Sequence, residues 1–335
     1  MSELMPSAKP ETLGLVVLDG TAGTAVTGAV DVLRLANALS GRELFAWRLL
    51  SVHGGDAEVA GGLGLRTDAG IAEAGPLDAL FVCDSRRRPD DHDPNFLAWL
   101  RQRARSGCVV GAIDTGGYAL AQAGLLAGRG CCVHWEALAA FGERYPDIDS
   151  SDELFRVEGQ FASCAGGTAA IDLMLSWVAG RHGDELARAI ADALIVPRLR
   201  RGDEAQRADA RERLGVCHTK LREVVGVMER TLEAPLPRDA LARRARLSTR
   251  QLERLFRQQL GCSPARYYLR LRLEKARRLL AQTEMQTLEI AIACGFVSAS
   301  HFAKAFRDQY GRTPREDRRA GPFADAPRRV SPVAA

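Results

Sequence analysis

One local pattern occurs twice near the C-terminal end of the chain and limits its fold more than any other feature. Residues 241–263 and 290–313 each contain a short helical stretch, a small-residue turn, a serine and a longer amphipathic helix. A glycine closes each longer helix and a proline follows three residues later, which fits a helix C-cap and the start of another helix. The repeat predicts an all-α domain with two helix-turn-helix units.

The longer helix of each unit has an apolar face and a polar face that suits DNA. Arg254 lies opposite Leu252 and Phe256 at 3.6 residues per turn. Arginine can bind guanine through two hydrogen bonds, glutamate can accept one from cytosine, and other basic side chains hold phosphates. A helical protein–protein module is the alternative. The residues predicted to contact DNA are Arg250, Glu253, Arg254 and Arg257 in the first unit, and Ser298, Ser300, His301, Lys304 and Arg307 in the second.

The charge distribution also distinguishes the two halves of the chain. From Ala205 onward the net charge is +13 and before it −9, although the whole chain carries only +4. The basic half is rich in arginine, which suits phosphate contact. Such an asymmetry favours a polyanionic partner for one half, and a merely solvated basic face is the alternative.

The first 195 residues alternate strand-like apolar runs with helical periodicity. Strands are predicted at residues 13–18, 47–52, 79–83, 108–113 and 160–164, and helices at 26–39, 94–106, 116–123 and 168–179. This alternation predicts an α/β domain built on an open, mainly parallel sheet. Apolar content then falls and charge rises, so residues 197–217 are predicted to be the linker between the domains.

The segment GAIDTGG, residues 111–117, follows a buried strand and precedes a helix. That sequence of elements is typical of a nucleophile elbow, but Asp114 stands where an enzyme would have serine or cysteine. Asp19 follows the first strand, at the place where open α/β sheets bind ligands. His134 comes 20 residues after Asp114. These positions predict a pocket at the carboxyl ends of the strands.

The C-terminal repeat resembles the AraC/XylS family of regulators. The segments that carry the likeness are SPARYYLRLRLEKARRLL and IAIACGFVSASHFAKAFRDQYGRTP, within about residues 219–318. The resemblance implies two recognition helices in successive major-groove segments on one face of double-stranded DNA. The base-reading positions that it implies are Arg250, Glu253 and Arg254, then Ala299, Ser300, His301 and Lys304. As a small apolar residue, Ala299 reads weakly or touches a thymine methyl group.

The N-terminal part, about residues 12–196, resembles the PfpI-type branch of the glutamine-amidotransferase-like fold. The segments DTGGYALAQAGLLAGRGCCVHWEALAAFGERYPDI and FASCAGGTAAIDLML carry this likeness, which is best to the GlxA-like regulators fused to AraC domains. Within that subfamily the HWE triplet and the LSGRELFAW stretch are similar to regulators of glycine betaine, carnitine and arginine catabolism. The expected domains are 12–196 for ligand sensing, 197–217 as linker, 218–319 for DNA binding, and 320–335 as a disordered tail.

Enzymes of this fold carry a cysteine at the elbow, and this chain departs from them there. None of the eight cysteines falls at the apex, so we expect a retained binding site with no catalytic residue. An acidic and partly aromatic cleft would suit a small cation such as a quaternary ammonium or a guanidinium group. Its predicted lining is Asp19, Asp114, Thr115, His134, Trp135 and Glu136.

Each of those residues also has a plainer interpretation. Trp135 and His134 can be core residues, Asp114 can cap the helix that follows it, and Glu136 can be a charge at a helix start. Only their closeness to one elbow favours a common site.

The sequence as a whole predicts a cytoplasmic, one-component transcription regulator. We expect a metabolite-binding and dimerising N-terminal domain and, by resemblance, an activator that works with RNA polymerase. We expect no signal peptide and no membrane span, because no apolar run is long enough to cross a membrane. We also expect no disulfide framework and no metal site, because the cysteines form no CxxC pair, and no cofactor. Two rival functions are an active hydrolase or amidase in the N-terminal domain, and a dimerisation scaffold that binds no ligand.

Overall fold

The computed structural model describes residues 9–86, 92–207 and 218–320. Contacts divide the chain into two compact units, Met1–Arg207 and Ala208–Ala335, which are described separately below. Residues 208–217 of the predicted linker and 321–335 of the predicted tail lie outside the described residues. Within the described part, no helix combines the length and apolar character that crossing a membrane requires.

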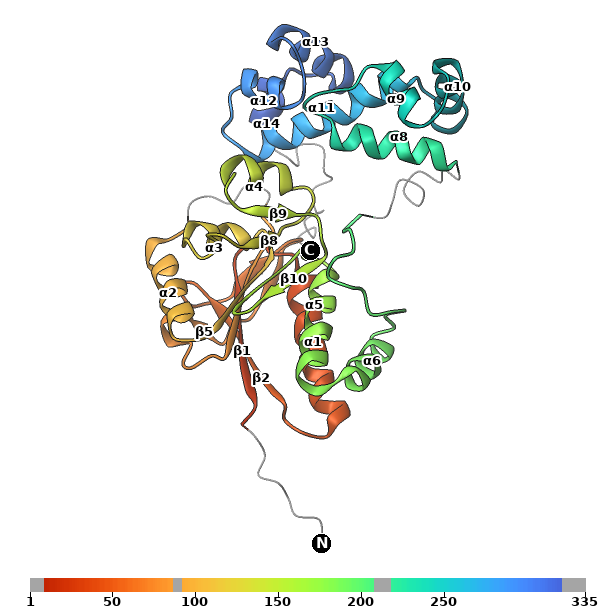
Figure 1. The fold of residues 1–335 in the computed structure, drawn as a ribbon. Coiled ribbons are helices and arrows are strands. Elements are labelled where there is room, and N and C mark those ends of the chain that lie inside the picture. Colours follow the sequence, from red (N-terminus) through yellow and green to blue (C-terminus); the bar gives the residue numbers. More distant parts are fainter. Residues whose placement is uncertain (1–8, 87–91, 208–217, 321–335) are drawn as a thin grey trace, which may run out of the picture. The chain divides into compact units, whose positions relative to one another are not determined.

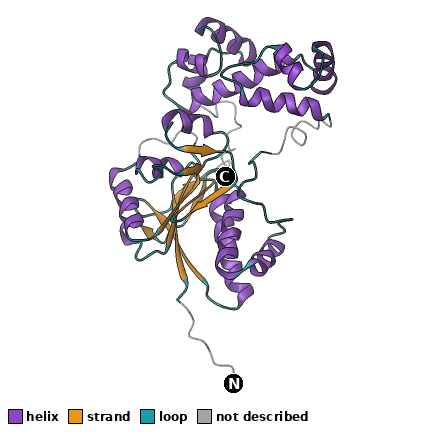
Figure 2. Cartoon of the chain, viewed as in Figure 1, coloured by secondary structure: helices purple, strands orange, loops and turns teal. Residues whose placement is uncertain are grey.

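The first unit is built on a seven-stranded sheet with the order β10-β11-β7-β6-β1-β2-β5 (Figures 1 and 2). Every neighbouring pair is parallel except β10 with β11. The strands are β1 (Glu11–Val17), β2 (Phe45–Ser51), β5 (Ala69–Gly70), β6 (Ala79–Asp84), β7 (Val109–Asp114), β10 (Phe155–Glu158) and β11 (Phe161–Cys164). This architecture confirms the predicted α/β class.

Helices cover both faces of the sheet, so its central strands are apolar along their whole length. One face packs on α1 (Gly23–Ser40), α5 (Ala169–His182) and α6 (Asp184–Ala193). The other packs on α2 (Pro94–Arg105) and α3 (Gly117–Gln122) (Figure 1). All six residues of β6 are buried, which explains why the run ALFVC has no alternation of polar and apolar residues.

Several short elements were not predicted from the sequence. They are the hairpin of β3 (Ala57–Val59) and β4 (Leu63–Leu65), the pair of β8 (Gly130–Cys132) and β9 (Asp149–Ser151), and α4 (Leu138–Arg144). The four strands have three residues each and α4 has seven, so all are too short to give a clear periodic signal.

Residues 198–207, which we call the strap, correct one part of the predicted linker. The strap is packed on the first unit, because Leu154 N donates to Glu204 O at 2.9 Å and Gln206 N to Asp152 O at 2.9 Å. Its charges suggested a solvated linker, but they pair internally: Arg198 with Glu204, and Arg201 with Asp203. A charged segment can therefore be ordered when its own ion pairs and backbone bonds satisfy it.

The second unit is helical throughout its described part. Its helices are α8 (Thr219–Arg230), α9 (Arg238–Arg244), α10 (Thr249–Leu260), α11 (Pro264–Gln282), α12 (Thr287–Ala293), α13 (Ala299–Tyr310) and α14 (Pro314–Ala320). α9 with α10, and α12 with α13, form the two expected helix-turn-helix units, and α11 contacts helices of both. The all-α prediction for this domain is confirmed.

The predicted punctuation of the repeat is also confirmed. Ser248 accepts a hydrogen bond from Gln251 N at 3.2 Å, and Ser298 accepts one from His301 N at 3.2 Å, so both cap their helices. Gly261 and Gly311 end α10 and α13 with φ of 65° and 75°. These left-handed positions favour glycine because it has no Cβ. Pro264 and Pro314 then begin α11 and α14.

The turn after β7 leaves no room for a larger residue than glycine. Gly116 has an ordinary φ of −55°, but a Cβ there would lie 2.1 Å from the carbonyl oxygen of Val82. We expect Gly116→Ala to lower the free energy of unfolding by about 1–3 kcal/mol, since strand β6 must shift. The control is Gly142→Ala in α4, where a Cβ would meet only the Ser150 hydroxyl at 3.8 Å. That change should stabilise by roughly 0.5–1 kcal/mol. Equal effects in urea unfolding would contradict this steric argument.

Candidate DNA-binding surface and ligand cavity

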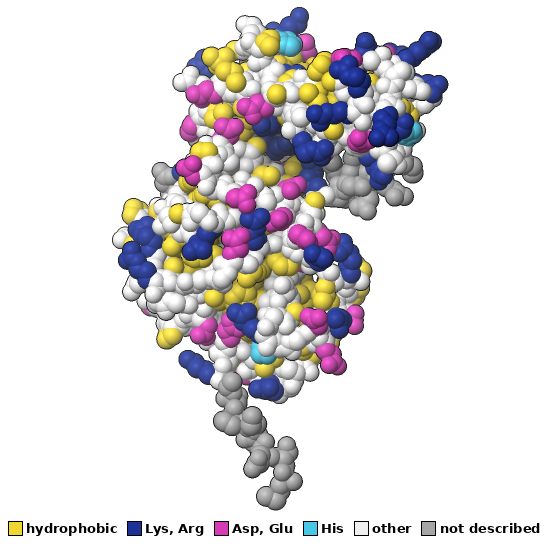
Figure 3. All heavy atoms as spheres, in the orientation of Figure 1, with side chains coloured by type: hydrophobic (Ala, Val, Ile, Leu, Met, Phe, Trp, Pro, Cys, Tyr) yellow, Lys and Arg dark blue, Asp and Glu magenta, His cyan; other side chains and the backbone are white. Residues whose placement is uncertain are grey.

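Helix α10 has the two faces that its sequence predicts. Leu252 and Phe256 are fully buried against α8, α9 and α11, while Arg250, Arg254 and Arg257 are exposed. Figure 3 shows several Lys and Arg side chains at the upper right of the view, where Figure 1 places α10. An exposed cationic helix that follows a tight turn is the arrangement that helix-turn-helix proteins insert into the major groove.

Glu253 differs from its neighbours on α10, because it already has a partner in the protein. Its carboxylate forms an ion pair with Arg238, the first residue of α9. Glu253 is only partly exposed, so this pair helps to hold α9 against α10. Any contact of Glu253 with cytosine must therefore compete with, or share, the Arg238 pair.

Helix α13 offers a less cationic face than α10. Ser300, His301, Lys304 and Arg307 are exposed, and Ala299 is half-buried. The hydroxyl of Ser298 already accepts from the His301 amide as a cap, so toward DNA it is left mainly with its O–H as a donor. The two helices thus present different chemistry, with three exposed arginines on α10 and, on α13, small and polar groups beside Lys304 and Arg307.

Some basic residues of the helical unit have an internal structural role that the sequence did not reveal. Arg272 of α11 donates from Nε to Cys294 O and from Nη2 to Gly295 O, both at 2.7 Å. Its guanidinium lies 4.0 Å from the centre of the Phe296 ring. Lys275 donates to Ala293 O at 2.9 Å. These cations satisfy carbonyls at the C-terminal end of α12 and join the second helix-turn-helix unit to α11.

The elbow of the first unit has the strained geometry expected of such a turn. Asp114 is buried and has a φ of 61°. A Cβ on Gly166 would lie 2.4 Å from the Asp114 Cβ, so the Asp114 side chain packs directly on that glycine. The hydroxyl of the next residue, Thr115, is buried and has no hydrogen-bond partner in the described part of the protein.

A second buried carboxylate stands beside the elbow and was missed in the sequence. Asp84 ends β6 and is paired in register with Asp114 of β7. Arg86 binds it through Nε to Oδ1 and Nη2 to Oδ2, each at 3.0 Å, and His92 Nε2 is 3.9 Å from Oδ2. Burial raises the pKa of this carboxyl, but His92 and Arg86 outweigh burial and hold the pKa below its usual value. The sequence did contain one sign of this site, namely an acidic residue, Asp84, at the end of the apolar strand ALFVCD.

The cavity at this edge of the sheet has a volume of about 290 Å³, which is near the lower limit for small-molecule sites. It lies beyond the carboxyl ends of β1 and β2, where open α/β sheets bind ligands. Asp19 lines it, and Asp19 Oδ1 also accepts from Glu58 N at 2.9 Å. The ionisable residues of its wall are Asp19, His53, Asp56, Arg86, His92 and Asp93.

The other five predicted ligand residues are not part of this cavity wall. His134, Trp135 and Glu136 follow β8, and Trp135 lies against the strap. Gln206 Oε1 accepts from Trp135 N at 2.7 Å, and the Arg207 guanidinium is 4.3 Å from the Trp135 ring centre. His134 lies 4.0 Å from a carboxylate oxygen of Glu136, and its ring packs against Trp135, so a common site with Asp19 stays a prediction.

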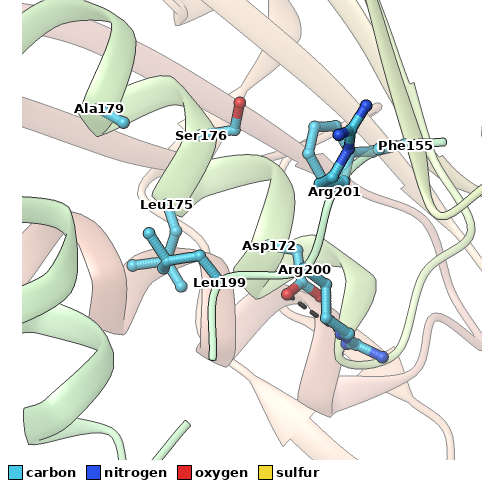
Figure 4. A pocket seen from close by; sticks show the side chains of 9 residues that line it. Phe155, Asp172, Leu175, Ser176, Ala179, Leu199, Arg200 and Arg201 are labelled. Atoms are coloured by element: carbon cyan, nitrogen blue, oxygen red, sulfur yellow. Dashed lines mark hydrogen bonds and ion pairs between the residues drawn. The ribbon is translucent and has the colours of Figure 1, made fainter. Parts of the chain in front are cut away.

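A second cavity of about 310 Å³ lies between α5 and the strap (Figure 4). Leu175 and Leu199 form part of its apolar wall. The ion pair between Arg200 Nη2 and Asp172 Oδ2, at 2.5 Å, lies along another side, and Arg200 also donates to the Thr168 hydroxyl at 2.8 Å. This pair fastens the strap to α5.

Five described cysteines of the first unit are buried. Burial raises the pKa of Cys131 to about 12 and the pKa values of Cys108 and Cys132 to about 11. Burial also raises the pKa of Cys83 and of Cys164, both of which lie near Asp114. These thiols are therefore protonated at neutral pH, and a thiol is a far weaker nucleophile than a thiolate.

Comparisons with known proteins agree with both halves of the structure. Residues 241–320 match the family model described as "Helix-turn-helix domain". The chain is 42% identical to the HTH-type transcriptional regulator GbdR of Pseudomonas aeruginosa, over 94% of this chain and 86% of that protein. It is 34% identical to the HTH-type transcriptional regulator GlxA of Rhizobium meliloti, over 95% and 99% of the two chains.

Solved structures match the α/β fold. An AraC family transcriptional regulator from Pseudomonas putida superposes with a TM-score of 0.51 and 31% identity, over 55% of this chain and all of that chain. A THiJ/PfpI family protein from Pseudomonas syringae superposes with a TM-score of 0.50 and 17% identity, over 70% and 93% of the two chains. The second likeness concerns the fold alone.

Arg272 provides a test of the structural role assigned to basic residues of α11. We expect Arg272→Ala to lower the free energy of unfolding of the helical unit by about 2–3 kcal/mol, because two partly buried carbonyls lose a charged donor. Arg250→Ala removes an exposed side chain and should change it by less than about 0.5 kcal/mol. Urea titration followed by circular dichroism measures both, and a similar small effect of the two changes would refute the assignment.

Proposed function

The chain belongs to the AraC/XylS family of DNA-binding transcription regulators, in its GlxA-like branch, and we propose that a small cationic metabolite bound by the α/β unit controls its activity. The observation that carries the proposal is the acidic cavity at the carboxyl edge of the sheet. The ligand would act on DNA binding by the helical unit, through its two capped recognition helices.

For the DNA contacts, we propose that Arg250 and Arg254 read bases. They lie in the first half of α10, and the N-terminal residues of a recognition helix are those that reach base edges. Arg257 and Arg307 stand in the last turns of their helices and are assigned to phosphates. On α13 the short side chains of Ala299 and Ser300 favour close approach, with His301 and Lys304 as donors.

For the effector, the charge of the cavity wall indicates the ligand class. Asp19, Asp56 and Asp93 contribute three carboxylates, whereas Arg86 is held by Asp84. An amine, a quaternary ammonium or a guanidinium compound complements such a wall. The resemblance to regulators of glycine betaine, carnitine and arginine catabolism points to the same class of compounds.

The mechanism that we propose is a population shift. A ligand that binds one arrangement of the two units better than another changes the fraction of molecules ready to bind DNA. We further propose that the protein acts in the cytoplasm as a homodimer, and that it activates transcription together with RNA polymerase. The cytoplasmic location, the homodimer, the activation and the role of RNA polymerase are proposed from the family resemblance.

We assign no catalytic role to the α/β unit, although its fold also occurs in enzymes. The elbow carries Asp114 instead of a thiol, and the two cysteines near it are buried and protonated at neutral pH. A hydrolase would show turnover by the purified protein that disappears in Asp114→Ala. A pure scaffold would bind no small molecule at all.

The effector proposal is tested by calorimetry on the full chain with glycine betaine, dimethylglycine, carnitine, choline, sarcosine and arginine. One of them should bind saturably, and Asp56→Asn should weaken that binding about tenfold, since a charge-assisted contact contributes about 1.5–3 kcal/mol. Asp56 is exposed on the cavity wall, so its change should leave the fold intact. The control is Asp147→Asn, an exposed carboxylate on the loop between α4 and β9. No binding by the folded protein across the panel would sink the cationic-ligand idea.

The base-reading role of Arg254 is tested separately by DNA titration. Arg254→Ala should weaken binding to a duplex selected from random sequences by about 1–3 kcal/mol, if the side chain holds guanine through two hydrogen bonds. Binding to a scrambled duplex should fall much less. Arg257→Ala, which we assign to a phosphate, should weaken both complexes by a similar factor. Unchanged affinity of the Arg254 variant for the selected duplex would exclude that role.

A further inference from the structure

The turn between α9 and α10 contains a residue in an unfavourable backbone conformation. Among the described non-glycine residues, Asp114, Ile195 and Arg246 have positive φ values, and that of Arg246 is 53°. A side chain with a Cβ crowds the backbone in this left-handed region, so glycine is the usual choice there. Arg246 therefore costs stability at a position where glycine would not.

The second helix-turn-helix unit shows what the same turn looks like with glycine. Arg246 N donates to Arg243 O at 3.0 Å, and Leu247 N donates to Ala242 O at 2.9 Å. In the second unit, Gly295 N donates to Ile292 O and Phe296 N to Ala291 O, both at 2.8 Å. The two turns close their first helices with the same pair of backbone bonds. Arg246 and Gly295 thus occupy equivalent positions.

The surroundings of the two positions differ. A Cβ on Gly295 would lie 2.7 Å from the carbonyl oxygens of Leu232 and Glu233, so only glycine fits there. Arg246 is exposed, and its described hydrogen bonds all involve its backbone: its amide donates to Arg243 O, and its carbonyl accepts from Lys220 Nζ at 3.1 Å. Its guanidinium makes no hydrogen bond or ion pair with the residues that the structure describes. Packing inside the protein therefore does not explain an arginine in this turn.

We propose that Arg246 binds a backbone phosphate of DNA beside the groove that α10 enters. This inference rests on the DNA-binding function of the helical unit. The turn directly precedes the N-terminal end of α10, and that end of a recognition helix is the one that reaches the bases. The phosphates that flank the groove lie next to such a turn, and exposed Arg244 and Arg250 add positive charge on either side. An exposed guanidinium with no ion pair among the described residues suits a phosphodiester oxygen.

Arg246→Gly should raise the stability of the chain and lower its affinity for DNA. The change relieves the left-handed strain, so the melting temperature of the full chain should rise by a few degrees. It also removes one phosphate contact, so the slope of log K against log salt concentration should become shallower by about 0.9. The probes are a duplex that the wild-type chain selects from random sequences and a scrambled duplex of the same length. Because phosphates carry no sequence information, affinity for both should fall by a similar factor.

Two further variants separate charge from backbone. Arg246→Lys keeps the charge and the strained conformation, so it should keep most of the salt slope without gaining stability. Arg188→Gln, on α6 of the α/β unit, removes one positive charge elsewhere and should leave the slope unchanged. The proposal is overturned if Arg246→Gly leaves affinity and salt slope unaltered. It is also overturned if only the selected duplex binds less well at a constant slope, because that result would indicate base reading or an altered turn.

Discussion

A parallel sheet that is covered on both faces can expose chemistry only where its strands end. In the α/β unit the central strands are buried along their length, so polar side chains collect at the carboxyl edge. All three aspartates stand at this edge: Asp19 follows β1, and Asp84 and Asp114 are the last residues of β6 and β7. The elbow, the ion pair between Arg86 and Asp84, and the acidic cavity all lie at this edge because of that one constraint. The same geometry that would orient a nucleophile in an enzyme here holds a carboxylate packed on a glycine.

Much of the fold could be predicted because its signals are local and strong. The serine caps, the left-handed glycines and the helix-starting prolines act within a few residues, and each element that they delimit is present. Roles that depend on distant partners could not be predicted in this way. Arg254 and Arg272 look alike in the sequence, yet one is exposed and the other holds carbonyls of α12. Asp84 was missed because its significance comes from register with Asp114, a property of strand pairing.

The strap shows a further limit of sequence patterns. Its composition resembles a solvated linker, but Gln206 satisfies three backbone groups at once: it accepts from Trp135 N and donates to Val133 O and Glu153 O. The segment with His134, Trp135 and Glu136 is thereby fixed to the last residues before the helical unit begins. A rearrangement of that segment would therefore break the hydrogen bonds that Gln206 makes with it. The sequence of the strap does not predict these hydrogen bonds, because they involve backbone atoms more than 50 residues away.

Helix α11 contacts both α10 and α13 and so connects the two proposed recognition helices. Its 19 residues extend over about 28 Å at 1.5 Å per residue. Arg272 and Lys275 bind the middle of α11 to the end of α12, and so join the second helix-turn-helix unit to α11. A span close to one turn of B-form DNA, roughly 34 Å, suits two insertions on the same side of the double helix. If both recognition helices enter the major groove as we propose, the spacing of a DNA site matters as much as its sequence: a site whose two halves are displaced by half a turn would present the second half on the wrong side.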